Sequence, residues 1–338
     1  MSAQVTRRER LNEVMKGFKP TSGTNIGLWL DKYILDATHT DKESRALFAR
    51  EVSAIDMSAE YDWFFKNWES YLREMDPACR KAKVGNRLAI GLGSEGVLET
   101  SVTLHRTYGV PYVPGSALKG LAAAFARQYC GPDWQIASDN FRVVFGDTES
   151  AGYVTFFDAL YVPKSGLNAK ALHFDVMTVH HRGYYEGKNQ PPADWDDPNP
   201  VPFISATGEY LIALAAPEGC EAWRELAREI LVSALENEGI GGKTSSGYGR
   251  MTMEAEPVDP EQQKAQALML SIKAIPIEKL SSELGQQATA LLSSQLPGKY
   301  KRQVAEYLVK RVNDAGGKQR KKFAEKPWFA EVERLLID

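Results

Sequence analysis

The sequence has few cysteines and no long apolar run, and each shortage excludes a class of protein. Three of its 338 residues are cysteine, Cys79, Cys130 and Cys220. Their odd number and wide spacing fit neither a disulfide framework nor a CxxC site for a metal or for redox chemistry. No segment approaches the roughly 20 apolar residues of a membrane-spanning helix, and the basic start lacks the apolar core of a secretory signal. We therefore expect a cytoplasmic protein with no membrane partner.

The chain also lacks an excess of either charge, but the balance is uneven along its length. Its 41 Lys and Arg against 44 Asp and Glu give a net charge of −3. Residues 299–326, here called the basic stretch, hold ten Lys or Arg and three Asp or Glu, a net of +7, so the remainder carries −10. This balance excludes only a uniformly basic protein. The basic stretch fits contact with RNA or with a protein neighbour, or a solvated helix surface, and these alternatives stay open.

Hydrophobic spacing divides the chain into three parts and predicts an α+β fold. Residues 1–84 and 258–338 carry apolar residues three to four apart, as helical regions do. Residues 85–257 alternate in the order β-α-β-β-α-β, the ferredoxin-like (RRM-like) arrangement, and the N-terminal helices are expected to pack on this core. The Pro-, Gly- and Asp-rich segment at about 161–202 has no clear period and predicts a long inserted loop. The expected strands are 87–92 with 101–104, 152–160, 209–216 and 248–255, and the expected helices are 118–129, 223–235, 271–294 and 299–312.

Two glycine motifs resemble nucleotide sites but lack the required context. Gly91–Gly96 matches G-x-G-x-x-G, yet strand-like residues follow it where a dinucleotide site requires a helix. Gly242-Lys243-Thr244 ends like a P-loop, yet Asn237 stands where the first glycine is required. A helix is expected before this motif and a strand after it, the reverse of a P-loop. We therefore expect no cofactor.

The segment 239–249, GIGGKTSSGYG, is the clearest binding motif in the chain, and we call it the glycine-rich loop. Five of its eleven residues are glycine, so the backbone can approach a ligand closely and direct its N–H groups outward. Lys243 and three hydroxyl side chains add donors suited to phosphate oxygens. Such a loop contacts a polyanion without reading its sequence. The alternative is a flexible connection that only returns the chain to the sheet.

A second candidate anion site lies in VPYVPGSALKG, residues 110–120. Pro114-Gly115 predicts a turn, and Ser116 is the expected N-cap of the next helix. Lys119 falls in the first helical turn, where negative charge is preferred, which suggests that an anion binds there. The alternative is an exposed lysine on a solvated face.

These motifs carry a family resemblance. VPGSALKG and GIGGKTSSGYGR together resemble the RAMP proteins, RNA-binding subunits of CRISPR systems whose ferredoxin-like cores hold a glycine-rich loop at this place. The segment DVMTVHHRGYY at 175–185, followed by Pro- and Asp-rich residues 191–202 and Phe203, narrows the resemblance to the sixth-subunit family of the type III-B, or Cmr, effector complex. The resemblance covers about residues 85–255.

The resemblance implies a non-catalytic, RNA-binding structural subunit of a ribonucleoprotein in antiviral defence. Such a subunit binds the guide RNA or its duplex with target RNA near the 3′ end of the guide and caps the filament of backbone RAMP subunits. It also contacts another RAMP subunit and the small helical subunit, and target cleavage belongs to the backbone subunit. The third expected strand, EYLIALAA, lacks the RNP1 pattern that begins K/R-G-F/Y, so we expect RNA contact through loops. The expected RNA-binding residues are Ser116, Lys119, His180, Arg182, Tyr184, Gly239, Gly241, Gly242, Lys243, Thr244, Ser245, Ser246, Gly247, Tyr248 and Gly249.

A metal-independent ribonuclease acting on CRISPR RNA is the competing hypothesis. Some RAMP relatives cut RNA with a histidine, and His180 or His181 could serve because imidazole titrates near neutrality. Adjacent histidines on an extended segment point to opposite faces, so at most one faces the RNA. A metal site at His173, Asp175 and His180 has no second motif in its support, and we expect neither a metal nor a catalytic residue. Arg182 and Tyr184 could stack on splayed bases, or Tyr184 could pack inward.

Overall fold

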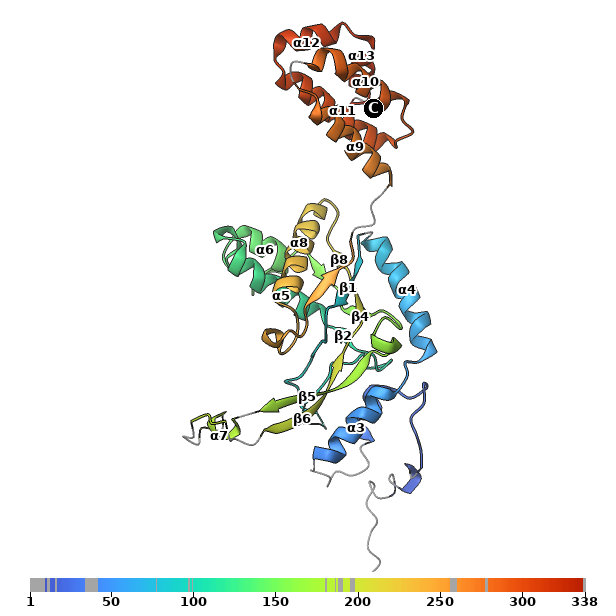
Figure 1. Ribbon diagram of the computed structural model, residues 1–338, viewed down its shortest axis with the longest axis vertical. Coiled ribbons are helices and arrows are strands. Elements are labelled where there is room, and N and C mark those ends of the chain that lie inside the picture. The colour runs from blue at the N-terminus through green and yellow to red at the C-terminus, as the bar shows by residue number, and fades with distance from the viewer. Residues whose placement is uncertain are drawn as a thin grey trace, which may run out of the picture. The chain divides into compact units, whose positions relative to one another are not determined.

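The computed structural model divides into two compact units, unit 1 (Met1–Glu254) and unit 2 (Ala255–Asp338), and each is described by itself (Figure 1). The described residues are 10, 13–15, 17–33, 42–76, 78–96, 98, 100–179, 181–185, 187, 191–194, 198–255, 260–276 and 279–336. Among the described helices, none is long and apolar enough to cross a membrane.

Unit 1 mixes helices with antiparallel sheets, which confirms the predicted α+β class. Its helices are α2 (Ile26–Lys32), α3 (Lys42–Ala54), α4 (Ala59–Met75), α5 (Gly115–Tyr129), α6 (Asp139–Phe145), α7 (Arg182–Tyr185) and α8 (Glu221–Asn237), with 3₁₀ turns η1 (Pro132–Trp134), η2 (Leu167–Ala169) and η3 (Thr244–Ser246). Its strands are β1 (Arg80–Val84), β2 (Tyr112–Val113), β3 (Thr155–Phe156), β4 (Ala159–Tyr161), β5 (Leu172–Val179), β6 (Asn199–Ala206), β7 (Glu209–Ile212), β8 (Leu214–Ala215) and β9 (Met251–Met253).

The main sheet has the order β2-β4-β7-β1-β9, and every neighbouring pair in it is antiparallel. All of β4 and most of β7 are buried, which requires cover on both faces of the sheet. In Figure 1, α5 and α8 lie to one side of these strands and α4 to the other. Tyr61 of α4 is buried and donates a hydrogen bond of 2.6 Å to the carbonyl of Tyr161 in β4. The N-terminal helices therefore share one apolar core with the sheet.

The two helices predicted in the middle of the chain are confirmed as α5 and α8. Leu118, Ala122 and Ala126 recur every four residues along α5 and are buried, as helical spacing predicts. Helix α8 ends as expected, because Gly239 takes a left-handed φ of +76° and its amide donates to the carbonyl of Ala234.

The first strand lies earlier than the sequence pattern indicated. The sheet uses β1 at Arg80–Val84, whereas the predicted segments 87–92 and 101–104 contribute isolated bridges, Leu88 to Ala206 and Leu104 to Pro111. In β1 the buried side chains are the small Ala82 and Val84, and lysines alternate with them. The apolar pattern of this strand is therefore weak, and the more apolar segment 87–92 was predicted as the strand in its place.

The segment predicted as a loop at 161–202 contains β5 and the first half of β6, which form a two-stranded ribbon, and also the turn η2 and helix α7. β5 and β6 pair antiparallel from Leu172–Ala206 to Val179–Asn199, and α7 lies near the end of the ribbon (Figure 1). Pro200 and Pro202 of β6 obscured this strand. Both prolines are an even number of residues from Ala206, so their backbone nitrogens lie on the same edge of the strand. The N–H of Ala206 points away from β5, to the carbonyl of Leu88. The missing N–H groups of the prolines therefore fall on the outer edge, where a strand tolerates proline.

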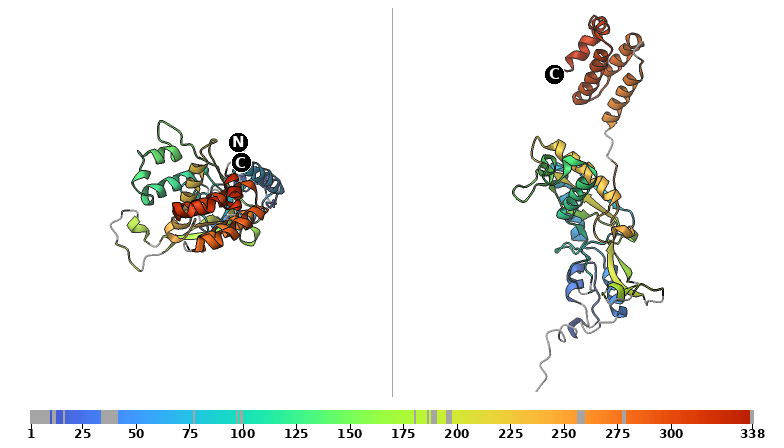
Figure 2. Two further views of the ribbon diagram at one scale, coloured as in Figure 1. Left: turned by 90° about the horizontal axis from the view of Figure 1, so that it is seen from above. Right: turned by 90° about the vertical axis from the view of Figure 1, so that its left-hand side faces the viewer.

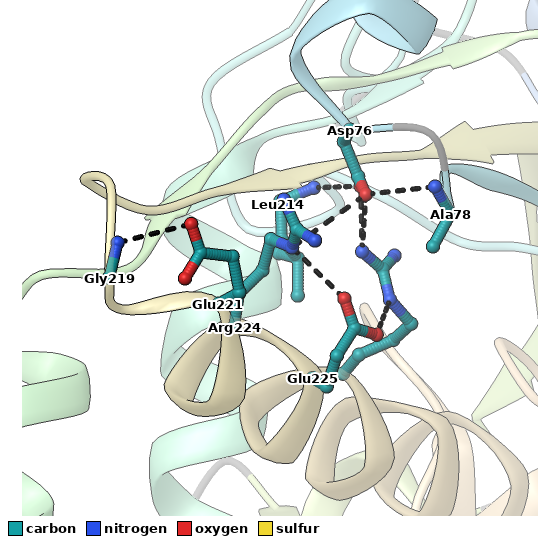
Figure 3. A network of polar contacts seen from close by, with 8 residues as sticks. Asp76, Ala78, Leu214, Gly219, Glu221, Arg224 and Glu225 are labelled. Atoms are coloured by element: carbon teal, nitrogen blue, oxygen red, sulfur yellow. Dashed lines mark hydrogen bonds and ion pairs between the residues drawn. The ribbon is translucent and has the colours of Figure 1, made fainter. Parts of the chain in front are cut away.

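A buried ion pair joins the end of α4 to α8 (Figure 3). Asp76 and Arg228 have side chains that are 0% and 2% exposed. One Nη atom of Arg228 lies 2.7 Å from each carboxylate oxygen of Asp76, and the amide of Leu214 donates to the same carboxylate at 2.9 Å. Glu225 contacts the outer side of the network through Arg224 and Arg228. The network thus links a helix end, a strand and a second helix that are distant in the sequence.

Unit 2 is all-helical among its described residues and has its own apolar core. Helices α9 to α13, orange to red in Figure 2, pack on one another. The predicted helix at 271–294 is wrong, because Pro276 lacks an N–H and divides it into two helices. The helix predicted at 299–312 is confirmed as α11. The bounds are α9 (Pro260–Ala274), α10 (Leu280–Ser293), α11 (Gly298–Asp314), α12 (Gly317–Ala324) and α13 (Pro327–Arg334).

Candidate nucleic-acid interface

The glycine-rich loop connects α8 to β9, so a helix precedes it and a strand follows, as predicted. Its centre is the turn η3, and Lys243 directly before η3 has φ +60° and ψ +30°. A residue with a Cβ is strained in this left-handed conformation, which glycine adopts freely. Strain of this kind gathers at functional sites, where the surrounding structure maintains it.

Successive amides at Lys243, Thr244 and Ser245 are available to a ligand. None of the three donates a hydrogen bond to another residue in the part of the chain that the structure describes. A left-handed residue followed by a helical turn brings such N–H groups together into a concave, anion-binding surface. Ser245 and Ser246 are exposed beside them. The arrangement can hold a phosphate by backbone amides, with the ammonium group of Lys243 nearby.

Three of the loop's glycines close the loop against the protein itself. A Cβ added at Gly249 would lie 1.9 Å from the carbonyl oxygen of Ile240, and one at Gly241 would lie 2.4 Å from that of Ala89. A Cβ at Gly239 would lie 3.0 Å from the backbone of Gly249. The number of glycines, which sequence reasoning attributed to ligand approach, is therefore explained in large part by close backbone packing. Gly247, with φ +85° and no atom within 4 Å of its added Cβ, faces open space.

Tyr248 attaches the loop to the β5–β6 ribbon. Its hydroxyl donates to the carboxylate of Asp175 at 2.9 Å, and its ring lies 6.1 Å from the ring of Phe203. Burial, followed by this hydrogen bond, raises the pKa of Tyr248 to about 12. Arg87 lies 3.9 Å from the same carboxylate, and its carbonyl accepts the amide of Gly249 at 2.7 Å. Tyr248 thus has a positioning contact inside the protein, a role that its sequence context did not indicate.

A groove separates the glycine-rich loop from α5 and has a volume of about 340 Å³. Its walls combine apolar side chains with polar groups, among them Gln128, Glu238 and Thr244. Lys119 and Ser116 are not among its lining residues. The lining residues that α5 and the loop contribute include Ala117, Leu121, Phe125, Ile240, Gly241 and Thr244.

The start of α5 differs from the prediction. Pro114, not Ser116, is the N-cap residue, and Ser116 lies exposed in the first turn. The carboxylate of Asp158 accepts the amide of Gly115 at 2.7 Å. The chain itself therefore supplies an anion at this helix end, where Lys119 had suggested an external one. Ser116 and Lys119 stay predictions as RNA contacts.

The predicted residues at the end of the β5–β6 ribbon are only partly described. His180 lies outside the described residues. Arg182 begins α7, and its side chain is not described. Tyr184 on α7 is 56% exposed, so the inward packing considered for it is not what the structure shows.

His173 and Asp175, considered as metal ligands, have protein partners. The Nε2 of His173 lies 3.2 Å from the carbonyl of Lys170 and 3.0 Å from the hydroxyl of Thr207. Because a carbonyl only accepts, Nε2 carries a proton and donates to it. Asp175 accepts from Tyr248. Within the described ranges no group of three metal-ligating side chains occurs.

A pH dependence follows from His173. Burial, followed by the charge of Arg87, lowers the pKa of His173 below its ordinary value of 6.5. The unfolded chain therefore binds this proton more readily, and stability falls as the pH drops below about 6.5. We expect His173→Gln to reduce this loss of unfolding free energy, by at most about 1.4 kcal/mol per pH unit. Denaturant unfolding between about pH 7.5 and 5.5 measures it, and equal pH slopes in both proteins would contradict the assignment.

The family follows from a comparison with known proteins. The RAMP superfamily model matches residues 81–252, half of the chain. The chain belongs to the RAMP superfamily. The matched residues run from β1 to β9 and so include the main sheet, α5, α8 and the glycine-rich loop. Unit 2 lies outside this RAMP match.

A curated relative agrees with the RAMP assignment and with the resemblance seen in the sequence. The CRISPR system Cmr subunit Cmr6 of Pyrococcus furiosus is 28% identical over 247 residues, covering 56% of this chain and 72% of that protein. A chain in the structure of the type III-B Cmr-beta complex bound to cognate target RNA matches with a TM-score of 0.50 and 17% identity, over 62% of this chain and 71% of that one. The crystal structure of Cmr6 from Pyrococcus furiosus matches at 29% identity with a TM-score of 0.36, over 52% and 97% respectively.

Sequence reasoning about this RAMP site missed Arg87 and the contact of Tyr248 with the ribbon, whereas Asp158 has the structural role that its isolated position in the sequence favours. Each acts through a partner far along the chain: Arg87 with Ser205, Asp158 with Gly115, and Tyr248 with Asp175. No local motif marks such pairs. The sequence indicated the turn at Lys243, because glycine and serine residues surround this position. It did not indicate that Lys243 itself takes the left-handed conformation.

Proposed function

We propose that the chain is a non-catalytic RNA-binding subunit of a type III-B CRISPR (Cmr) ribonucleoprotein. It caps the backbone filament near the 3′ end of the guide RNA and contacts the guide and its target RNA in antiviral defence. Its protein partners are the backbone RAMP subunit, another RAMP subunit and the small helical subunit, and its compartment is the cytoplasm. The observation that carries the RNA contact is Lys243, held in a left-handed conformation next to amides with no described protein partner.

The core of the proposed subunit is ferredoxin-like. Strands β4, β7, β1 and β9 are neighbours in that order and antiparallel, α5 lies between β1 and β4 in the chain, and α8 lies between β7 and β9. This is the sheet order expected of a β-α-β-β-α-β core. We retain the division 1–84, 85–257 and 258–338 into a helical region, a core and a helical extension, but move the start of the core from 85 to β1 at Arg80. The β5–β6 ribbon takes the place of part of the inserted loop.

RNA runs across the glycine-rich loop in this proposal. Backbone amides and hydroxyl groups bind phosphate oxygens, which positions RNA without reading its bases. Gly239, Gly241 and Gly249 shape the loop, while Gly242, Lys243, Thr244, Ser245, Ser246 and Gly247 form its contact surface. Ser116, Lys119, His180, Arg182 and Tyr184 extend the contact, and Tyr248 holds the loop on the ribbon. Support comes from the sequence relation to Cmr6 and from the charge and exposure of the loop.

We expect Lys243→Gln to weaken the binding of short single-stranded RNA equally for unrelated sequences. The loss of one phosphate contact lowers the slope of log affinity against log salt by about 0.7. Fluorescence anisotropy over a salt series measures both effects. Lys119→Gln tests the second predicted lysine separately. Lys66→Gln is the matched control, because Lys66 is 74% exposed on α4 and pairs with Asp62. An unchanged slope for Lys243→Gln would mean that the loop does not touch phosphate.

The same labelled RNA distinguishes the ribonuclease hypothesis. In a single-turnover incubation, with and without chelator, the scaffold proposal expects intact RNA. Cleavage that disappears in a His180→Ala or His181→Ala protein would replace the scaffold by a metal-independent endoribonuclease.

A further inference from the structure

Unit 2 separates its charges by helix. Residues 255–338 contain 14 Lys or Arg and 11 Asp or Glu. The basic stretch holds ten of these cations and three of the anions, so it carries +7 while the rest of unit 2 carries −4. The basic stretch corresponds to α11, α12 and the residues up to the start of α13. Separation of this kind creates a local positive field that the near-neutral total conceals.

Helix α11 presents cations on the side opposite its core contacts. Tyr300, Val304 and Leu308 recur every four residues, are buried and face the apolar core of unit 2. At 100° per residue, Lys310 falls on the other side and is exposed. Lys299, in the first turn, is also exposed, and its ammonium group lies 4.5 Å from the centre of the Tyr300 ring. The apolar seam therefore holds the helix in place and leaves this side to solvent.

Helix α12 adds three consecutive cations, Arg320, Lys321 and Lys322, all exposed. Consecutive residues of a helix project 100° apart, so these three side chains spread over an arc of about 200° around α12. The next residue, Phe323, is 2% exposed and anchors α12 in the core of unit 2. Across the described part of unit 2, no carboxylate lies within ion-pair distance of these three cations. Their charge is left for an external partner.

The composition of this surface favours a nucleic acid over a protein. Protein interfaces have an apolar centre, and lysine is depleted from them. Among the described residues of unit 2, the one large apolar side chain that is well exposed is Leu270, at 64%, and it lies on α9. Lysine is a hydrated point charge on a flexible stem, which suits the many equivalent oxygens of a phosphate backbone.

We propose that the exposed sides of α11 and α12 form a second RNA-binding surface, which contacts the phosphate backbone independently of the glycine-rich loop. The proposal rests on the proposed function only in taking RNA as the polyanion. Unit 2 is outside the RAMP match, so the surface adds affinity that the RAMP core does not provide. Because it contacts phosphates, it strengthens binding without selecting a sequence.

The test uses the full chain with Arg320, Lys321 and Lys322 all changed to Gln. The probe is a short labelled single-stranded RNA of arbitrary sequence. Three lost phosphate contacts should reduce the salt slope by about 2, and the affinity near 0.1 M salt should fall on the order of 10- to 100-fold. The matched control changes Lys264, Lys273 and Lys279 to Gln. These lysines are exposed in unit 2 outside the basic stretch, so the net charge changes equally.

The control triple is expected to bind RNA nearly as the parent does. Equal RNA affinity and equal salt slope for the two triple variants would overturn the proposal. It would also be overturned if the α12 triple bound RNA as the parent does but no longer bound an acidic protein partner. Thermal unfolding of both triples verifies that the exposed substitutions leave the fold intact. Lys243→Gln in the same assay separates the two sites: loss in the α12 triple alone supports this surface and contradicts the loop, and loss in Lys243→Gln alone does the reverse.

Discussion

Asp76→Asn is expected to lower the unfolding free energy of unit 1 by about 3–5 kcal/mol, because it leaves the buried Arg228 guanidinium without its counter-charge. Both side chains are essentially unexposed, and Arg228 lies 2.7 Å from both carboxylate oxygens. The amides of Leu214 and Ala78 donate to different carboxylate oxygens, so an asparagine keeps an acceptor for only one of them and also removes the charge. Denaturant unfolding, followed by a signal from unit 1, measures the difference.

Two further variants make the Asp76 prediction specific. Glu225→Gln removes a carboxylate that is 41% exposed and contacts the same arginines, so it should cost at most about 1 kcal/mol. Adding Arg228→Met to Asp76→Asn should recover part of the lost stability, because the uncompensated charge is then absent. If Asp76→Asn costs no more than Glu225→Gln, the ion pair does not hold α4 to α8 as described.

Gly249→Ala is expected to destabilise unit 1 by more than about 3 kcal/mol and to abolish the RNA contact of the glycine-rich loop. Gly249 has a φ of +73°, and an added Cβ would lie 1.9 Å from the carbonyl oxygen of Ile240. The Ile240 atoms that the added Cβ would meet are backbone atoms, so they cannot move aside without opening the loop. Its amide also donates to the carbonyl of Arg87, and this contact would be displaced as well.

Gly247→Ala is the matched control for this substitution. Gly247 has a φ of +85°, similar to that of Gly249, but nothing lies within 4 Å of an added Cβ. It should therefore show only the left-handed penalty, about 1–2 kcal/mol. The difference in unfolding free energy between the two variants isolates the backbone contact. Equal losses of unfolding free energy in the two variants would show that close packing of Gly249 against Ile240 is not needed to close the loop.

Elements with strong local periodicity were predictable from the sequence. Leu118 and Ala122 in α5, and Val304 and Leu308 in α11, lie on buried helical faces as their spacing indicates. Amphipathic spacing reports burial directly, because one side of a helix faces the core. The glycine at 239 marked the end of α8 for an equally local reason, its left-handed conformation.

The elements that escaped prediction depend on their neighbours. β1 carries only Ala82 and Val84 as inward apolar residues, and its place at the centre of the sheet comes from pairing with β7 and β9. β6 contains Pro200 and Pro202, which are compatible with a strand only because their side of the strand needs no hydrogen bonds along most of its length. Propensity alone cannot indicate which edge of a strand is free.

By itself, the sequence determined the fold class, the family, the helices α5, α8 and α11, the position of the glycine-rich loop and the uneven charge of the C-terminal region. These features rest on local patterns of residue type and spacing. Only the tertiary structure decided that Asp76 meets Arg228, that Tyr248 docks on Asp175, that Asp158 caps α5, and which loop glycines pack against backbone. Each of the three side-chain contacts joins groups more than 40 positions apart, and such partners are chosen by packing and by the burial of polar groups, which no local pattern encodes.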